Sequence, residues 1–326
     1  MMRLAVLADI HGNLPALEAV VTDVERHRPD HVIVAGDLIN STPFSVEVVE
    51  FIMQRDWLVI RGNHEFYYLD FNSPRVHPDL ENPSRWRALH QLNRIVPEHL
   101  GNYLAVLPDD LSLKWPSHEP LRVVHGMPGD PRAAVFPFTT DEQASELLAG
   151  VVEHTVVTAH THIPGERQVV RQAHAPSALS PNPPFKEPEL RAGHWHIINP
   201  GSVGLPLNGD PGADYAILDS NPGADEGEGW AVTFCKVPYN REKTLRAYFD
   251  RGEFRTGGAI VELFYWEVVT AQPEIIEFFS WARRQGLNSQ DIDRNLTLYK
   301  QHTGRDTAIE AIDPTGLYKS AEFRHA

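Results

Sequence analysis

The sequence predicts an α/β fold, an α+β sandwich in which two packed mixed β-sheets are flanked by helices. Three observations lead to this prediction: strand-like and helical stretches alternate over residues 3–63, short strand-like runs recur over residues 111–237, and helical periodicity dominates after residue 250. With 326 residues, the chain is long enough for one large domain with an appendage or for two domains. Its hydrophobic content of 42% is ordinary for a globular protein.

The first elements alternate regularly. Short apolar runs read as buried strands, and each is followed by a stretch with helical spacing, such as Leu14, Leu17 and Val20. Near-continuous apolar strands are typical of sheets covered by helices on both faces, so this sheet should begin parallel. We expect strands at 3–8, 31–37 and 57–63, and helices at 14–27 and 45–54.

Residues 66–108 are rich in aromatic, His and Pro residues and contain a predicted helix at 84–93, so they read as a helical, cap-like insertion. The chain then becomes rich in short strands with turn residues between them, which indicates a second sheet packed on the first. We expect these strands at 111–115, 121–126, 154–160, 167–171, 194–201, 214–219 and 230–237.

We assign residues 1–250 to one domain and residues 251–326 to a carboxyl-terminal helical extension. Within the first domain, the Pro-rich stretch 175–193 predicts an exposed loop, and 221–229 has the composition of a hairpin tip. The last residues, 319–326, should be frayed.

The charge balance bears on possible partners. Lys and Arg total 29 against 44 Asp and Glu, which gives a formal charge of −15. Such a surface repels phosphate backbones, so nucleic acid is an unlikely partner.

The single cysteine, Cys235, forms no internal disulfide and should be a buried strand residue. No apolar stretch is long enough to span a membrane, and we expect a cytoplasmic protein. Both a monomer and a homo-oligomer are compatible with the sequence.

Five clusters of metal-coordinating or proton-transferring side chains recur in order along the chain. Each follows a predicted strand, at the carboxyl end where open α/β sheets place their ligand sites. Imidazole and carboxylate groups are ligands that transition metals favour, so the clusters together predict a two-metal hydrolytic site. The clusters are Asp9 with His11, Asp37, Asn63 with His64, His125, and His160 with His162.

The segments LADIHGN, VAGDLI, RGNHE, VVHGMP and TAHTHIP resemble the motifs of the calcineurin-like metallophosphoesterase family. The short ADIHGN and the later NPGSVGLP are most similar to its small bacterial and archaeal phosphodiesterase-type members, and the resemblance spans roughly residues 3–240. It implies that Asp37 bridges two divalent ions. It further implies that Asp9, His11 and His162 complete one ion's ligands, and Asn63, His125 and His160 the other's.

Residue spacing agrees with this arrangement. Residues two apart on an extended strand point to the same side, so His160 and His162 could enter one site if their segment stays extended. The same expectation applies to Asp9 and His11.

The resemblance also implies a mechanism. Two cations roughly 3.5 to 4 Å apart hold a hydroxide that attacks phosphorus in line. The catalytic residues would be Asp37, through its bridging role, and His64, next to the Asn63 ligand. His64 would act as general acid, with Glu65 expected to hold its imidazole. Manganese, iron, zinc, cobalt and nickel all suit the ligands.

The expected substrate is a small phosphate ester, more specifically a phosphodiester or nucleotide. Asn13 and Arg61, which adjoin the ligand clusters, are further candidates for binding it. The aromatic residues Tyr67 and Trp86 of the insertion either stack a ring of the substrate or form the core of a cap. The turn Asn199–Ser202 is expected chiefly to support the histidine loop.

Other functions remain open at this stage. A non-catalytic protein-interaction module on this fold would lack ligands, whereas every ligand position is filled here. A phosphomonoesterase or protein phosphatase is a second alternative, but Asp37 is followed by LINST instead of the Asp-Arg-Gly continuation of protein phosphatases. A nuclease would need a basic surface, which the charge does not supply.

Overall fold

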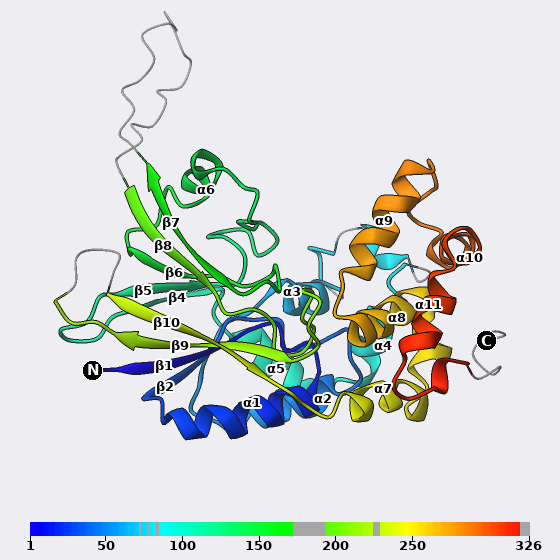
Figure 1. Ribbon diagram of the computed structural model, residues 1–326, viewed down its shortest axis with the longest axis horizontal. Helices are drawn as coiled ribbons and strands as arrows, with labels where there is room; N and C mark the ends of the chain where they lie inside the picture. Colours follow the sequence, from blue (N-terminus) through cyan, green and yellow to red (C-terminus); the bar gives the residue numbers. More distant parts are fainter. Residues whose placement is uncertain (72, 77, 83–84, 172–192, 224–228, 320–326) are drawn as a thin grey trace, which may run out of the picture.

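The computed structural model describes residues 1–326 apart from 72, 77, 83–84, 172–192, 224–228 and 320–326. In this part of the chain, ten strands form two five-stranded mixed sheets that stack on one another, with helices outside them (Figure 1). The predicted fold class is therefore confirmed. The expected exposed loop lies outside the described residues except for Gly193, and most of the expected hairpin tip and frayed tail lie outside them too.

The first sheet has the order β10-β9-β1-β2-β3. β1 pairs with β2 and β2 with β3 in parallel, as the alternating pattern predicted, whereas β9 runs antiparallel to both β1 and β10. The third strand is only two residues long, much shorter than the expected 57–63. The strands are β1 (Arg3–Leu7), β2 (His31–Val34), β3 (Leu58–Val59), β9 (Ala213–Ser220) and β10 (Trp230–Val237).

The second sheet has the order β4-β5-β6-β8-β7. Its central strands β5, β6 and β8 are parallel, and antiparallel strands close both edges. The strands are β4 (Asp110–Leu113), β5 (Leu121–Val124), β6 (Thr155–Val157), β7 (Gly165–Arg171) and β8 (Gly193–Asn199).

A shared apolar layer lies between the sheets. Leu4 and Val6 of the first sheet belong to one buried cluster with Val123 and Ile198 of the second. Their alternation along each strand places every second side chain in this layer. The expected packing of the second sheet on the first is confirmed.

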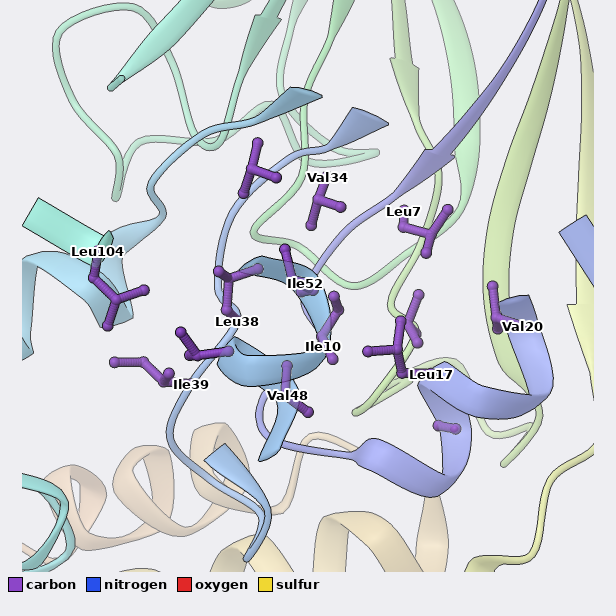
Figure 2. Close-up of a cluster of buried hydrophobic side chains, with 14 of the residues drawn as sticks. Leu7, Ile10, Leu17, Val20, Val34, Leu38, Ile39, Val48, Ile52 and Leu104 are labelled. Atoms are coloured by element: carbon purple, nitrogen blue, oxygen red, sulfur yellow. The ribbon is translucent and has the colours of Figure 1, made fainter. Parts of the chain in front are cut away.

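The opposite face of the first sheet is covered by α1 (Leu14–His27) and α2 (Ser45–Met53). Figure 2 shows their apolar side chains, including Leu17 and Val48, facing Leu7 and Val34 of the strands. Asn13 caps α1 by accepting a hydrogen bond from the Ala16 amide. Both helices match their predicted positions closely.

The expected insertion is helical. It contains α3 (Asn63–Asp70), a 3₁₀ turn at Pro78–Glu81, α4 (Arg87–Ile95) and α5 (Glu98–Val106). Leu89, Leu100 and Leu104 belong to the same buried cluster as α1 and α2, so this segment extends the main core. α6 (Asp141–Leu147) lies on the outer face of the second sheet.

The carboxyl-terminal helices gather at the end of the molecule away from the amino terminus (Figure 1) and enclose a core of their own. That core includes Leu245 and Tyr248 of α7, so the helical packing begins before residue 251, the expected boundary. The elements are α7 (Arg241–Asp250), α8 (Glu253–Thr270), α9 (Glu274–Arg284), α10 (Ile292–Thr303), α11 (Arg305–Ile312) and a 3₁₀ turn at Leu317–Lys319.

Cys235 lies on β10 as predicted, but its side chain is only partly buried. The prediction of a buried residue was wrong because β10 is the edge strand of its sheet. Among the described helices, none combines the length and apolar character needed to cross a bilayer.

Candidate metal centre

The loops after β1, β2 and β6 bring their polar residues together through an unusual backbone. Asp9, His11, Asp37, His160 and His162 all have positive φ, between 50° and 67°. The expectation that the pairs 9/11 and 160/162 stay extended was therefore wrong. Left-handed conformations cost a non-glycine residue roughly 1 kcal/mol or more, so other contacts must hold them.

Backbone hydrogen bonds between neighbouring loops provide that support. The amide of Asp9 donates to Gly36 O at 3.1 Å, and that of His11 donates to Asp37 O at 2.9 Å. The His160 amide donates to Asp9 Oδ2 at 3.2 Å, which ties a loop of the second sheet to a loop of the first. The ligand-bearing loops are thus fixed by tertiary contacts.

One group of potential ligands consists of Asp9, His11 and His162, whose ligand atoms lie within 4.8 Å of one another. The Nε2 atoms of His11 and His162 are 3.2 Å apart. His162 Nε2 is 3.4 Å from Asp9 Oδ1. All three side chains are buried.

A second group consists of Asp37, His125 and His160. His125 Nε2 is 3.2 Å from Asp37 Oδ2 and 2.9 Å from the amide oxygen of Asn63. The structure therefore brings Asn63 to this group as well.

Asp37 lies between the two groups. Its Oδ2 is 3.6 Å from His11 Nε2 and 3.9 Å from His64 Nε2, in addition to its contact with His125. The structure thus gathers the other six residues predicted as metal ligands, together with His64, around the Asp37 carboxylate.

The arrangement of donors fits cations. A carbonyl oxygen can only accept, so the Nδ1 atoms of His125 and His162, at 2.8 Å from Ala35 O and 2.6 Å from Leu205 O, carry the protons. In the neutral rings this leaves the Nε2 lone pairs directed at the cluster. Asp9 Oδ1 is fully buried without a hydrogen-bond partner among the described residues. Converging lone pairs and an unsatisfied carboxylate oxygen are what metal ions would stabilise.

Burial controls the ionisation of the imidazoles. It lowers the pKa of His160 and of His162 to about 4, with nearby imidazoles adding to the effect, so both rings are neutral at pH 7. Burial also opposes the charged form of His125, but the carboxylates of Asp37 and Asp9 outweigh it and raise that pKa to about 10. A metal ion bound at His125 Nε2 would therefore displace a proton.

Glu65 does not hold His64, contrary to the prediction. Its buried carboxylate accepts backbone hydrogen bonds from Asp37 and Gly62 through Oε2, and from Leu38 and Ile39 through Oε1. It therefore joins the loop after β2 to the start of α3. Burial, followed by the charge of Asp37, raises its pKa to about 7.

Asn40 and Ser41 orient the imidazoles instead, and the sequence did not identify them. Asn40 Nδ2 is 2.8 Å from His64 Nδ1, and Ser41 Oγ is 3.3 Å from His11 Nδ1. Their only signal in the sequence is a short polar run after Leu38 and Ile39, which is common in loops.

Two predicted substrate-binding residues have other contacts. The buried Asn13 amide donates to Gly204 O and to the Tyr239 hydroxyl, and its oxygen accepts from Thr244, which leaves no group for a substrate. Asn13 is a helix cap held by distant loops, and its contacts do not support the predicted substrate-binding role.

Arg61 is likewise directed elsewhere. Its Nε donates to Asp109 at 2.8 Å, Nη1 donates to Ala105 O, and the guanidinium lies 5.0 Å from the Phe66 ring centroid. These contacts join β3 to α5 and account for its position without a substrate. The turn Asn199–Ser202 is structural as expected, because Asn199 donates to Ala159 O and Ser202 donates to Asp9 O.

Tyr67 and Arg132 border the cluster on the side of His64. The Tyr67 ring lies edge-on to the His64 ring, with 5.4 Å between the centroids, and at a tilt to the Trp86 ring, with 5.3 Å between the centroids. Arg132 Nε donates to the Tyr67 hydroxyl at 3.3 Å. A pocket of about 330 Å³ adjoins this region, lined by Phe66, Asp70, Asp109, Asp110 and the segment 124–132.

Comparison with known proteins identifies the family. The family model described as calcineurin-like phosphoesterase matches residues 2–164, half of the chain. The chain belongs to the calcineurin-like phosphoesterase family. This confirms the resemblance of the motifs, and as a calcineurin-like phosphoesterase the protein is a metal-dependent phosphoric ester hydrolase.

Several relatives of this calcineurin-like phosphoesterase support the fold. A metallophosphoesterase from Sphaerobacter thermophilus is 24% identical with a TM-score of 0.58, over 83% of this chain and 99% of its own. A hypothetical protein from Pyrococcus horikoshii OT3 is 19% identical with a TM-score of 0.60, over 81% and 98%. An uncharacterized protein of Methanocaldococcus jannaschii is 25% identical over 242 residues, 74% of this chain and 89% of that protein.

Proposed function

We propose that this calcineurin-like phosphoesterase hydrolyses a small phosphodiester, with nucleotide-type esters as the preferred class, at a dinuclear metal site. The observation that carries the proposal is the position of Asp37 Oδ2, 3.6 Å from His11 Nε2 and 3.2 Å from His125 Nε2. A two-metal site needs one ligand shared by both ions, and this carboxylate lies between the two ligand groups.

In this proposal one ion would be held by Asp9, His11 and His162 and the other by Asn63, His125 and His160. Asp37 would serve as a ligand to both. When bound, the ions supply Lewis-acid polarisation of the phosphoryl group and a nucleophilic water. The imidazole, carboxylate and amide donors suit manganese, iron, zinc, cobalt or nickel. Manganese is the ion with which we would begin.

His64 is the proposed proton donor to the leaving alkoxide. Asn40 lies 2.8 Å from its Nδ1 and orients the ring, so that Nε2, 3.9 Å from Asp37 Oδ2, faces the cluster. The imidazolium form would give its Nε2 proton to the leaving oxygen and become a neutral imidazole. Edge-on contacts with His11 at 4.6 Å and Tyr67 at 5.4 Å restrict the ring. Its side chain is 17% exposed, so it can reach a substrate at the mouth of the cluster.

The surroundings support a small substrate. The 330 Å³ pocket beside His125 and Arg132 has room for one small ester substituent, and the net charge of −15 disfavours long nucleic acids. We therefore place the substituent near Phe66 and Tyr67.

The test compares bis-p-nitrophenyl phosphate with p-nitrophenyl phosphate, using metal-stripped protein reconstituted with manganese. We expect two manganese ions per chain and faster turnover of the diester. Asp37→Asn, which removes the shared ligand charge, should retain its fold by circular dichroism but lose both turnover and metal.

The contrary outcomes are distinct. A single ion per chain at saturation contradicts the dinuclear site, and preferred turnover of the monoester makes the protein a phosphomonoesterase. Two bound ions without turnover of either ester, or of a panel of nucleotide diesters, would favour the protein-interaction module.

A further inference from the structure

The loop Asn40–Phe44, between β2 and α2, touches the catalytic cluster with two consecutive side chains. Asn40 holds His64 Nδ1 and Ser41 holds His11 Nδ1. Both loop residues have left-handed backbones, with φ of 72° and 75°. Two consecutive non-glycine residues in this region are unfavourable unless surrounding contacts fix them.

One of the contacts that fix this loop comes from α7, about 200 residues later in the chain. The buried Tyr248 hydroxyl donates to Ser41 O at 2.8 Å. The next amide, that of Thr42, donates to His11 O at 3.0 Å. The peptide group between Ser41 and Thr42 is therefore held on both sides, by α7 at its oxygen and by the loop after β1 at its nitrogen.

Arg251, directly after α7, holds the other end of the loop. Its Nη1 donates to Pro43 O at 2.9 Å, and its Nη2 donates to Glu47 at 2.6 Å. The guanidinium carbon lies 4.3 Å from the Phe44 ring centroid. One side chain thus contacts three groups at the junction between the loop and α2.

We propose that α7 is a positioning element for the phosphoesterase site, and that Tyr248 and Arg251 orient His64 and His11 through the loop Asn40–Phe44. Tyr248 packs edge-on against Tyr265 of α8, at 5.5 Å between ring centroids, so the loop is coupled to the carboxyl-terminal helices. This role rests on the proposed function of the two histidines. The carboxyl-terminal helices would thereby have a structural role in positioning the phosphoesterase site.

The experiment compares Tyr248→Phe with Tyr265→Phe. Each removes one hydroxyl from the same helical core, but the Tyr265 hydroxyl contacts Thr315 and not the loop. Hydrogen–deuterium exchange of the amides of residues 40–45 in metal-free protein reports on the loop directly. Steady-state kinetics of the manganese-loaded protein on bis-p-nitrophenyl phosphate report on the site.

We expect Tyr248→Phe to increase amide exchange in the loop and to lower kcat by roughly ten- to a hundredfold with KM within about twofold, because the reacting groups lose their alignment. Tyr265→Phe should match wild type in both measurements. Arg251→Lys should resemble Tyr248→Phe, since an ammonium cannot reproduce the planar contacts of the guanidinium.

Equal exchange and equal kcat in the two tyrosine variants would overturn the proposal. A wild-type protein without turnover would contradict the proposed function, whereas the exchange data would still decide whether α7 fixes the loop.

Discussion

At the scale of single residues, backbone carbonyl groups set the orientation of the metal-facing imidazoles. His125 donates to Ala35 O and His162 donates to Leu205 O, so each ring presents Nε2 to the cluster. Ala35 directly follows β2, and Leu205 lies in a loop far along the chain. The protonation pattern of the site is thus determined by the fold around it.

His64→Ala tests the proton donor. We expect kcat on a diester with an alkyl leaving group to fall by about 10²- to 10⁴-fold, because a poor leaving group depends on protonation. The loss on bis-p-nitrophenyl phosphate should be much smaller, since nitrophenolate leaves readily. Steady-state rates on both esters are compared, with the exposed His99→Ala as control. An equal loss on the two esters would exclude the acid role.

Glu65→Gln tests the buried carboxylate. The amide would direct an N–H₂ group at two backbone N–H donors, which leaves buried groups unsatisfied. We expect the free energy of unfolding to fall by about 2 to 4 kcal/mol in urea titrations. Glu98→Gln on the exposed surface of α5 should change it little. A stable Glu65→Gln protein would show that the four amides need no anionic acceptor.

At the scale of elements, the turns after β2 and β3 lie against each other at glycines. A Cβ on Gly62 would lie 2.2 Å from Asp37 Oδ1 and 2.6 Å from the Asp37 amide nitrogen. Gly62 has φ of −108°, so its requirement is steric and not conformational. The shared carboxylate can occupy its position only because this side chain is absent.

Gly62→Ala should therefore displace Asp37. We expect fewer than two manganese ions per chain, measured by mass spectrometry of the metal, and a lower melting temperature. Gly150→Ala is the matched control, because nothing lies within 4 Å of the added Cβ. Full metal occupancy in Gly62→Ala would mean that the turn can move without affecting the ligands.

The order of elements and the residues that gather in the cluster could be predicted because apolar periodicity and chemically distinctive residues are local features. The sequence did not predict the left-handed backbones of His160 and His162, which depend on bonds between loops. Glu65 was misassigned for the same reason, since its partners come from a different loop. Asn40 and Ser41 carry no local signal that distinguishes them from ordinary loop residues.

At the scale of the whole molecule, the carboxyl-terminal helices contain a buried acid. Glu267 of α8 accepts from the Ile275 amide at 3.1 Å, and burial, with Glu274 nearby, raises its pKa to about 8. A carboxyl whose pKa is raised on folding binds more protons in the folded state than in the unfolded state between about pH 4.5 and pH 8. Its contribution to stability is therefore present at low pH and is lost as the pH rises through this window.

Glu267→Gln should abolish that dependence. We expect the variant to gain stability relative to wild type as the pH rises from 5 to 8, by about 1 to 3 kcal/mol. Urea unfolding of both proteins across this range measures the difference, in which titration of the metal site cancels. The exposed Glu277→Gln should show no such trend. A constant difference between Glu267→Gln and wild type would contradict the prediction.

The order β10-β9-β1-β2-β3 has a consequence for synthesis on the ribosome. β1 is complete after residue 7, but its antiparallel neighbour β9 ends only at Ser220. The growing chain thus carries an open, apolar strand edge while some two hundred further residues are added, the condition under which nascent chains associate wrongly. The hydrogen bond from His162 Nδ1 to Leu205 O likewise cannot form until residue 205 has been synthesised. With the proposed ligand set, metal capture should therefore be a late event in the maturation of this protein.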